Sequence, residues 1–180
     1  SCLFRYSFPL VSNNGNYMTL HNPNKLLDGS LKKLGFIDEP IITYWNNMRD
    51  VKKPKHIKIS EAFNRIKTAN NGDLLPLFAQ MRASGIDKEE YNKLKRRLPV
   101  YSFAGKFSYR NDSSCEKYEG FITIDLDNLP GQGFKLETVK QQLSQDPYTF
   151  ACFISPGGDG LKVLVRLPID PDSHTTRYLS

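Results

Sequence analysis

Hydrophobic residues recur at helical spacing in three successive segments of the first half of the chain. The segments are 60–69, 73–81 and 87–98, and each places its apolar side chains three or four residues apart. Ser60 and Asp73 stand where N-caps are expected. In the third segment Asp87 begins a capping box that ends at Glu90. The pattern predicts three amphipathic helices.

After Pro99 the hydrophobic period changes from about 3.6 to 2. Aromatic residues then alternate with small or polar ones over 101–109, which predicts extended structure with a bend at Gly105. Aromatic residues in a strand are usually core, although their rings could also stack on bases. The next elements are expected in the order strand, helix, strand, turn and strand: 120–127, 136–143, 148–154, 155–160 and 161–167.

These elements predict an α+β fold, with a helical N-terminal part and a ferredoxin/RRM-like βαββ(αβ) antiparallel sheet. Pro171, Asp172 and Ser173 look like the start of a second helix. The last helix and strand of the unit are therefore expected beyond Ser180, in a C-terminally truncated domain. Residues 1–40 are expected to be irregular or extended, and 41–180 to form one domain that opens with a short strand at Ile41–Trp45.

The composition fits a single globular domain of 180 residues, with 39% hydrophobic and 24% charged residues. No apolar stretch approaches the roughly 20 residues of a membrane span, so no membrane partner is expected. Cys2, Cys115 and Cys152 have no zinc-site spacing, which favours reduced thiols and a cytoplasmic location.

The net charge of +6 suits a partner that carries phosphate. The surplus is concentrated in two runs, within 49–58 and 93–97, although each run could simply be a solvated loop or helix end. Lys106 and Arg110 lie in and after the aromatic segment and are candidate nucleic-acid contacts.

Two carboxylates stand at the end of the strand expected over 120–127. Alternation along a strand places Asp125 and Asp127 on one face, roughly 6–7 Å apart. Like charges at this spacing repel each other unless a cation lies between them. Mg²⁺ or Mn²⁺ suits such oxygen ligands, although an acidic turn after a strand is also common.

Alternation in the last strand adds two cations to that face. Lys162 and Arg166 are expected on the side that carries Asp125 and Asp127. The turn that precedes them contains Ser155, Gly157, Gly158 and Gly160, whose small size would let the backbone approach a phosphate. Carboxylates, fixed cations and such a turn together favour a metal-bound nucleoside triphosphate, whereas a hairpin turn alone would explain the glycines.

Three segments carry a resemblance to a known family: LPVYSFAGKFSYR at 98–110, GFITIDLDNLP at 120–130 and PYTFACFISPGGDGLKVLVRLP at 147–168. They resemble the N-terminal domain of the virulence-associated protein E family of phage and mobile-element replication proteins. That family is similar to the archaeo-eukaryotic primase and primase-polymerase superfamily. The resemblance covers the chain from about Trp45 onward.

The resemblance implies DNA replication by nucleotidyl transfer, with a DNA or RNA template, a nucleoside triphosphate and a helicase downstream or in trans as partners. Asp125 and Asp127 would be the catalytic metal ligands, whereas Ser155, the three turn glycines, Lys162 and Arg166 would hold the nucleotide. Lys162 stands where the superfamily has His, and Gly157 where it has Ser. The third acidic motif would lie beyond Ser180. An alternative therefore stays open, a non-catalytic nucleic-acid-binding or docking module with the same fold.

Overall fold

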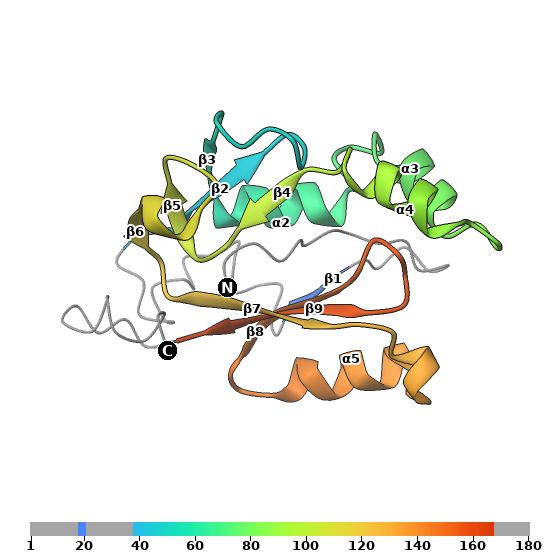
Figure 1. The fold of residues 1–180 in the computed structure, drawn as a ribbon. Coiled ribbons are helices and arrows are strands. Elements are labelled where there is room, and N and C mark those ends of the chain that lie inside the picture. Colours follow the sequence, from blue (N-terminus) through green and yellow to red (C-terminus); the bar gives the residue numbers. More distant parts are fainter. Residues whose placement is uncertain (1–17, 21–37, 168–180) are drawn as a thin grey trace.

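The computed structural model describes residues 18–20 and 38–167, and it places a central antiparallel sheet between two layers (Figure 1). The sheet has the order β1-β8-β9-β7. Its strands are β1 (Met18–Leu20), β7 (Phe121–Leu126), β8 (Thr149–Ile154) and β9 (Leu161–Arg166). Helix α5 (Leu136–Gln145) packs on one face of this sheet.

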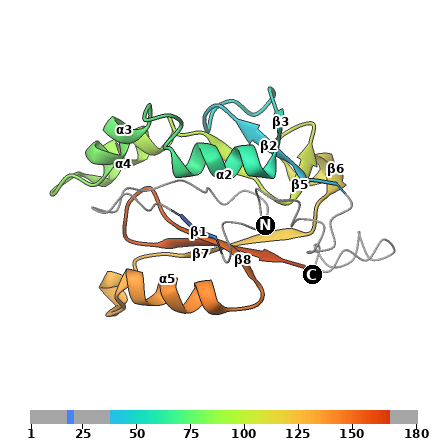
Figure 2. The ribbon, with the colours of Figure 1, turned by 180° about the vertical axis from the view of Figure 1, so that it is seen from behind.

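A second layer covers the opposite face of the sheet (Figures 1 and 2). A small sheet of order β3-β2-β4 and three helices build most of it. Its elements are β2 (Ile41–Trp45), β3 (Lys55–Lys58), α2 (Ile59–Lys67), α3 (Leu75–Met81), α4 (Lys88–Lys95) and β4 (Val100–Ser102). A hairpin of β5 (Gly105–Phe107) and β6 (Cys115–Tyr118) lies at the end of the molecule away from α3 and α4.

The main hydrophobic core fills the space between the central sheet and the second layer. Phe121, Phe153 and Leu164 enter it from the sheet, and none of them is exposed. Phe63 of α2 and Phe103 stack at 5.6 Å between ring centroids. The predicted aromatic segment is therefore core at its buried positions, where the rings are closed to bases.

Sequence and structure agree on most elements after residue 40. The strand Ile41–Trp45 and the hairpin strands on either side of the turn at 155–160 are confirmed. Asp87 caps α4, since its side chain accepts the Glu90 backbone N–H at 2.8 Å. The aromatic segment is divided into β4 and β5 at Gly105, where a Cβ would collide with the Lys117 carbonyl oxygen.

Two expected helix starts are wrong. Helix α2 begins one residue before Ser60, directly after β3, and the Ser60 backbone N–H donates to Glu39 Oε1. Helix α3 begins after Leu74, so Asp73 is not its N-cap. At Ser60 a contact with the distant Glu39 replaces the local cap, whereas the Asp73 carboxylate accepts a hydrogen bond from the Asn70 side chain instead of capping the helix.

The fold is a mixed α+β fold, as predicted from the sequence. In the central sheet β9 runs antiparallel to both of its neighbours, β8 and β7. The expectations for most of 1–40 and for the helix start after Pro171 fall outside the described residues. Within the described residues, no helix combines the length and apolar character needed to cross a membrane.

Candidate functional site

The two predicted site strands lie side by side, and their register brings Asp125 directly opposite Lys162. The Lys162 ammonium lies 2.6 Å from Asp125 Oδ2, and the two side chains are only 7% and 9% exposed. Both point to the face that also carries Phe121 and Leu164, toward the second layer. Strand alternation therefore correctly placed Asp125 and Lys162 together.

This ion pair is incompletely satisfied. Asp125 Oδ1 is buried and has no hydrogen-bond partner among the described residues. Burial lowers the pKa of Lys162, and nearby Lys95 lowers it further, while Asp125 and Asp127 oppose the shift. A buried carboxylate oxygen without a partner is costly, so this position is suited to an additional cation or donor.

Asp127 lies just beyond the end of β7 and is exposed. Its charge acts on both Lys162 and Tyr91, which places it at the same end of the sheet. The loop that follows is tied to the Gly-rich turn, because the Leu129 backbone N–H donates to the Asp159 carbonyl at 2.8 Å. The acidic loop after β7 and the Gly-rich turn are therefore joined, and together they border the site around Asp125.

The Gly-rich turn between β8 and β9 rises toward α3 and α4 (Figures 1 and 2). Inside the turn the Ser155 hydroxyl donates to Asp159 Oδ1 and accepts the Gly160 backbone N–H, both at 3.2 Å. A Cβ at Gly157 would lie 2.9 Å from the Tyr91 hydroxyl, and one at Gly158 3.1 Å from Arg82 Nε. The glycines thus allow close approach of protein side chains from the second layer.

The sequence does not identify Arg82 and Tyr91 as residues of this region, and it offers Lys95 only as part of the basic run at 93–97. Arg82 follows α3, and its Nε donates to the Pro156 carbonyl at 2.9 Å. Tyr91 and Lys95 belong to α4. Helical periodicity identifies buried apolar positions on these helices, but it does not reveal that their polar residues face a turn more than sixty residues later.

Arg166 does not join this cluster. It lies opposite Phe121, four residues from Lys162, which corresponds to roughly 13 Å along the strand. Burial lowers the pKa of its guanidinium. At that distance Arg166 and Lys162 cannot bind the same phosphate group.

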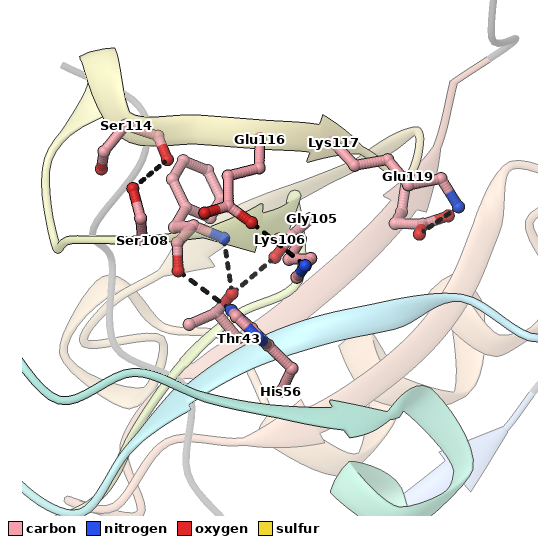
Figure 3. A network of polar contacts seen from close by, with 10 residues as sticks. Thr43, His56, Gly105, Lys106, Ser108, Ser114, Glu116, Lys117 and Glu119 are labelled. Carbon is pink, nitrogen blue, oxygen red and sulfur yellow. Dashed lines mark hydrogen bonds and ion pairs between the residues drawn. The ribbon is translucent and has the colours of Figure 1, made fainter.

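The candidate nucleic-acid contacts Lys106 and Arg110 lie at the other end of the molecule. Lys106 is in the β5–β6 hairpin and pairs with Glu116 at 3.1 Å (Figure 3). The hairpin is fastened by buried Thr43, which donates to the Gly105 carbonyl and accepts the Phe107 backbone N–H (Figure 3). The Arg110 backbone N–H donates to the Val51 carbonyl. Any role of these two cations is therefore separate from the carboxylate site.

Residues 93–179 match the model of the family described as BT4734-like, N-terminal domain. No curated protein and no solved structure matches the chain. The prediction that the chain belongs to the virulence-associated protein E family is therefore wrong, because the family match names a different domain and nothing indicates a primase-polymerase family. The matched residues include the carboxylates, the turn and Lys162, whereas Arg82 and Tyr91 precede them.

Proposed function

We propose that the site around Asp125 binds a nucleoside triphosphate together with Mg²⁺ or Mn²⁺, and that the chain serves nucleotidyl transfer to nucleic acid. One observation carries the proposal. A buried Asp125 carboxylate has one oxygen paired with Lys162 and the other without a partner among the described residues, close to the exposed Asp127. An unsatisfied anionic oxygen beside a second carboxylate supports a bound divalent cation.

The donor set suits a metal that is completed by its substrate. Asp125 Oδ1 and Asp127 would supply two protein ligands. No group of three or more His, Cys, Asp or Glu side chains able to hold a metal lies within the described ranges. Mg²⁺ commonly takes one or two carboxylates and the phosphates of its substrate, so this sparse set is appropriate. The ion would neutralise the triphosphate and polarise the phosphorus under attack.

Lys162 has a defined part in this proposal. In the present structure its ammonium neutralises Asp125. With a divalent cation on the carboxylates, that neutralisation is no longer needed, and the ammonium becomes available to a phosphate oxygen. Residues Ser155, Gly157, Gly158 and Gly160 would then border the phosphates through the turn backbone. Arg166 is left out of the site because of its position along β9.

A second candidate function is a nucleic-acid-binding or docking module without catalysis. The 2.6 Å contact of Lys162 with Asp125 favours it, because that ammonium already supplies the charge a metal would supply. The packing of Gly157 and Gly158 against Tyr91 and Arg82 favours it as well, since it gives the glycines a purely structural reason. Either proposed function would involve DNA or RNA and a helicase as partners. Both would place the protein in the cytoplasm.

The antiparallel order β8-β9-β7 supports a further part of the proposal, that this region is a ferredoxin/RRM-like unit. In such a unit a helix and a strand after β9 would add the last strand beside β7. The central sheet gains β1 on the opposite side, next to β8.

The experiment is titration of a labelled nucleoside triphosphate, with and without Mn²⁺, on the wild type and on Asp125→Asn. The wild type should bind more tightly with Mn²⁺, and Asp125→Asn should lose that enhancement. Without metal Asp125→Asn should bind at least as well as the wild type, because Lys162 is released from its carboxylate. Asp112→Asn, an exposed site in the loop before β6, is the matched control and should behave as the wild type. An equal Mn²⁺ effect in Asp125→Asn and wild type would exclude the metal assignment and favour the binding module.

A further inference from the structure

Arg82 lies where the second layer touches the Gly-rich turn. It follows α3 directly, and its Nε donates to the Pro156 carbonyl at 2.9 Å. The guanidinium lies over the Phe78 ring, 5.6 Å from its centroid. Contacts to a carbonyl and an aromatic face hold the guanidinium in place, and no carboxylate of the described residues forms an ion pair with it.

One terminal nitrogen of the guanidinium is unsatisfied. Arg82 Nη2 is buried and has no hydrogen-bond partner among the described residues. Burial lowers the pKa of Arg82, and among the described residues Tyr91, rather than a carboxylate, opposes the shift. A half-buried cation with a buried, unbonded nitrogen costs free energy, and a bound anion lowers that cost.

The surroundings connect Arg82 to the carboxylate site. Its Nε is near enough to Gly158 that a Cβ there would lie 3.1 Å away. Tyr91, which approaches Gly157, also feels the charges of Asp159, Asp127 and Arg82. The turn that Arg82 contacts leads within two residues to Lys162. This side of the site therefore carries two cations: Lys162 of β9, which is paired with Asp125, and Arg82 of the second layer, which has no ion-pair partner among the described residues.

We infer that Arg82 is an anion-binding residue of this site and that its Nη2 donates to a phosphate group of a polyphosphate ligand. The location rests on the proposed function, but the chemistry does not require the metal. The planar fork keeps Nε on Pro156 while Nη2 reaches a phosphate oxygen, a division of donors that Lys does not offer. Arg82 precedes the matched family segment, and it makes the second layer part of ligand recognition.

The test is binding of inorganic triphosphate in metal-free buffer, measured by calorimetry for wild type, Arg82→Gln and Arg82→Lys. Arg82→Gln keeps a donor for the Pro156 carbonyl but removes the charge, and we expect at least a tenfold loss of affinity. Arg82→Lys keeps the charge without the fork and should recover only part of that loss. Arg65→Gln, which removes an arginine paired with Glu61 on α2, is the control and should bind as the wild type does.

The outcomes separate this inference from the proposed function. Weakened triphosphate binding by Arg82→Gln, with an unchanged melting temperature, supports the inference even if Asp125→Asn keeps its Mn²⁺ response. Unchanged affinity in Arg82→Gln overturns the inference even if Asp125→Asn loses that response. Failure of the wild type to bind triphosphate also overturns it. If Arg82→Gln does not fold, the comparison of Arg82→Lys with Arg65→Gln decides, and equal affinities overturn the inference.

Discussion

The buried pair of Lys162 and Asp125 shows how much depends on single residues in this sheet. Two charges that are less than 10% exposed are tolerable only while each neutralises the other. The pair also lies next to the apolar side chains of the main core, so a lone charge there would have little access to water.

We predict that Lys162→Met lowers the free energy of unfolding by about 3–5 kcal/mol, because it leaves the Asp125 carboxylate buried without a cation. Lys106→Met is the matched control, since it removes a lysine whose partner Glu116 is 42% exposed, and it should cost less than about 1 kcal/mol. Urea denaturation at neutral pH measures both. The double variant Lys162→Met/Asp125→Asn should regain most of the loss. Equal losses in Lys162→Met and Lys106→Met would contradict a stabilising ion pair.

At the scale of elements, the strands of the C-terminal half were predictable because local sequence pattern and tertiary environment agree there. Strand β9 alternates residues of the α5 face, such as Val163, with Leu164 of the main core, and the turn at 155–160 joins it directly to its neighbour β8. Strand alternation predicted that Asp125 and Lys162 share a face, whereas their direct pairing comes from the register between β7 and β9. Strand β6 was not predictable, because Cys115–Tyr118 is largely exposed and has no hydrophobic alternation.

The contribution of the second layer to the site could not be predicted for a different reason. Arg82 and Tyr91 reach the turn only through the packing of α3 and α4 over the central sheet. No local spacing encodes that contact, and the family match begins after both residues. The sequence shows that the turn is rich in glycine, but not that these glycines approach Arg82 and Tyr91.

The close approach of turn and strand gives a prediction at this scale. A Cβ at Gly160 would collide with the Leu126 carbonyl oxygen, whereas one at Gly85 meets nothing within 4 Å and is disfavoured only by its φ of +79°. We expect Gly160→Ala to lower the free energy of unfolding by about 3 kcal/mol, because β9 must move away from β7. Gly85→Ala should cost about 1 kcal/mol, which isolates the backbone effect. Thermal unfolding compares the two, and a larger cost for Gly85→Ala would show that the collision is relieved elsewhere.

For the whole molecule, the two basic runs occupy different places and should act differently on nucleic acid. Arg96 and Arg97 are exposed at the end of α4, next to Lys95, whose charge reaches Lys162. Lys52 and Lys53 are exposed in the connection between β2 and β3. If single-stranded nucleic acid passes the carboxylate site, Arg96 and Arg97 contact its phosphates, whereas Lys52 and Lys53 do not.

The corresponding prediction concerns the salt dependence of single-stranded DNA binding. Each phosphate contact contributes about 0.7 to the slope of log K against log salt concentration for a single strand. Arg96→Gln/Arg97→Gln should therefore reduce the magnitude of the slope by about 1.4 and weaken binding for every sequence tested. Lys52→Gln/Lys53→Gln removes the same charge and should leave the slope nearly unchanged. Fluorescence anisotropy over a series of salt concentrations measures both. Equal reductions would mean that the protein attracts nucleic acid through its net charge of +6 rather than along a path beside Asp125.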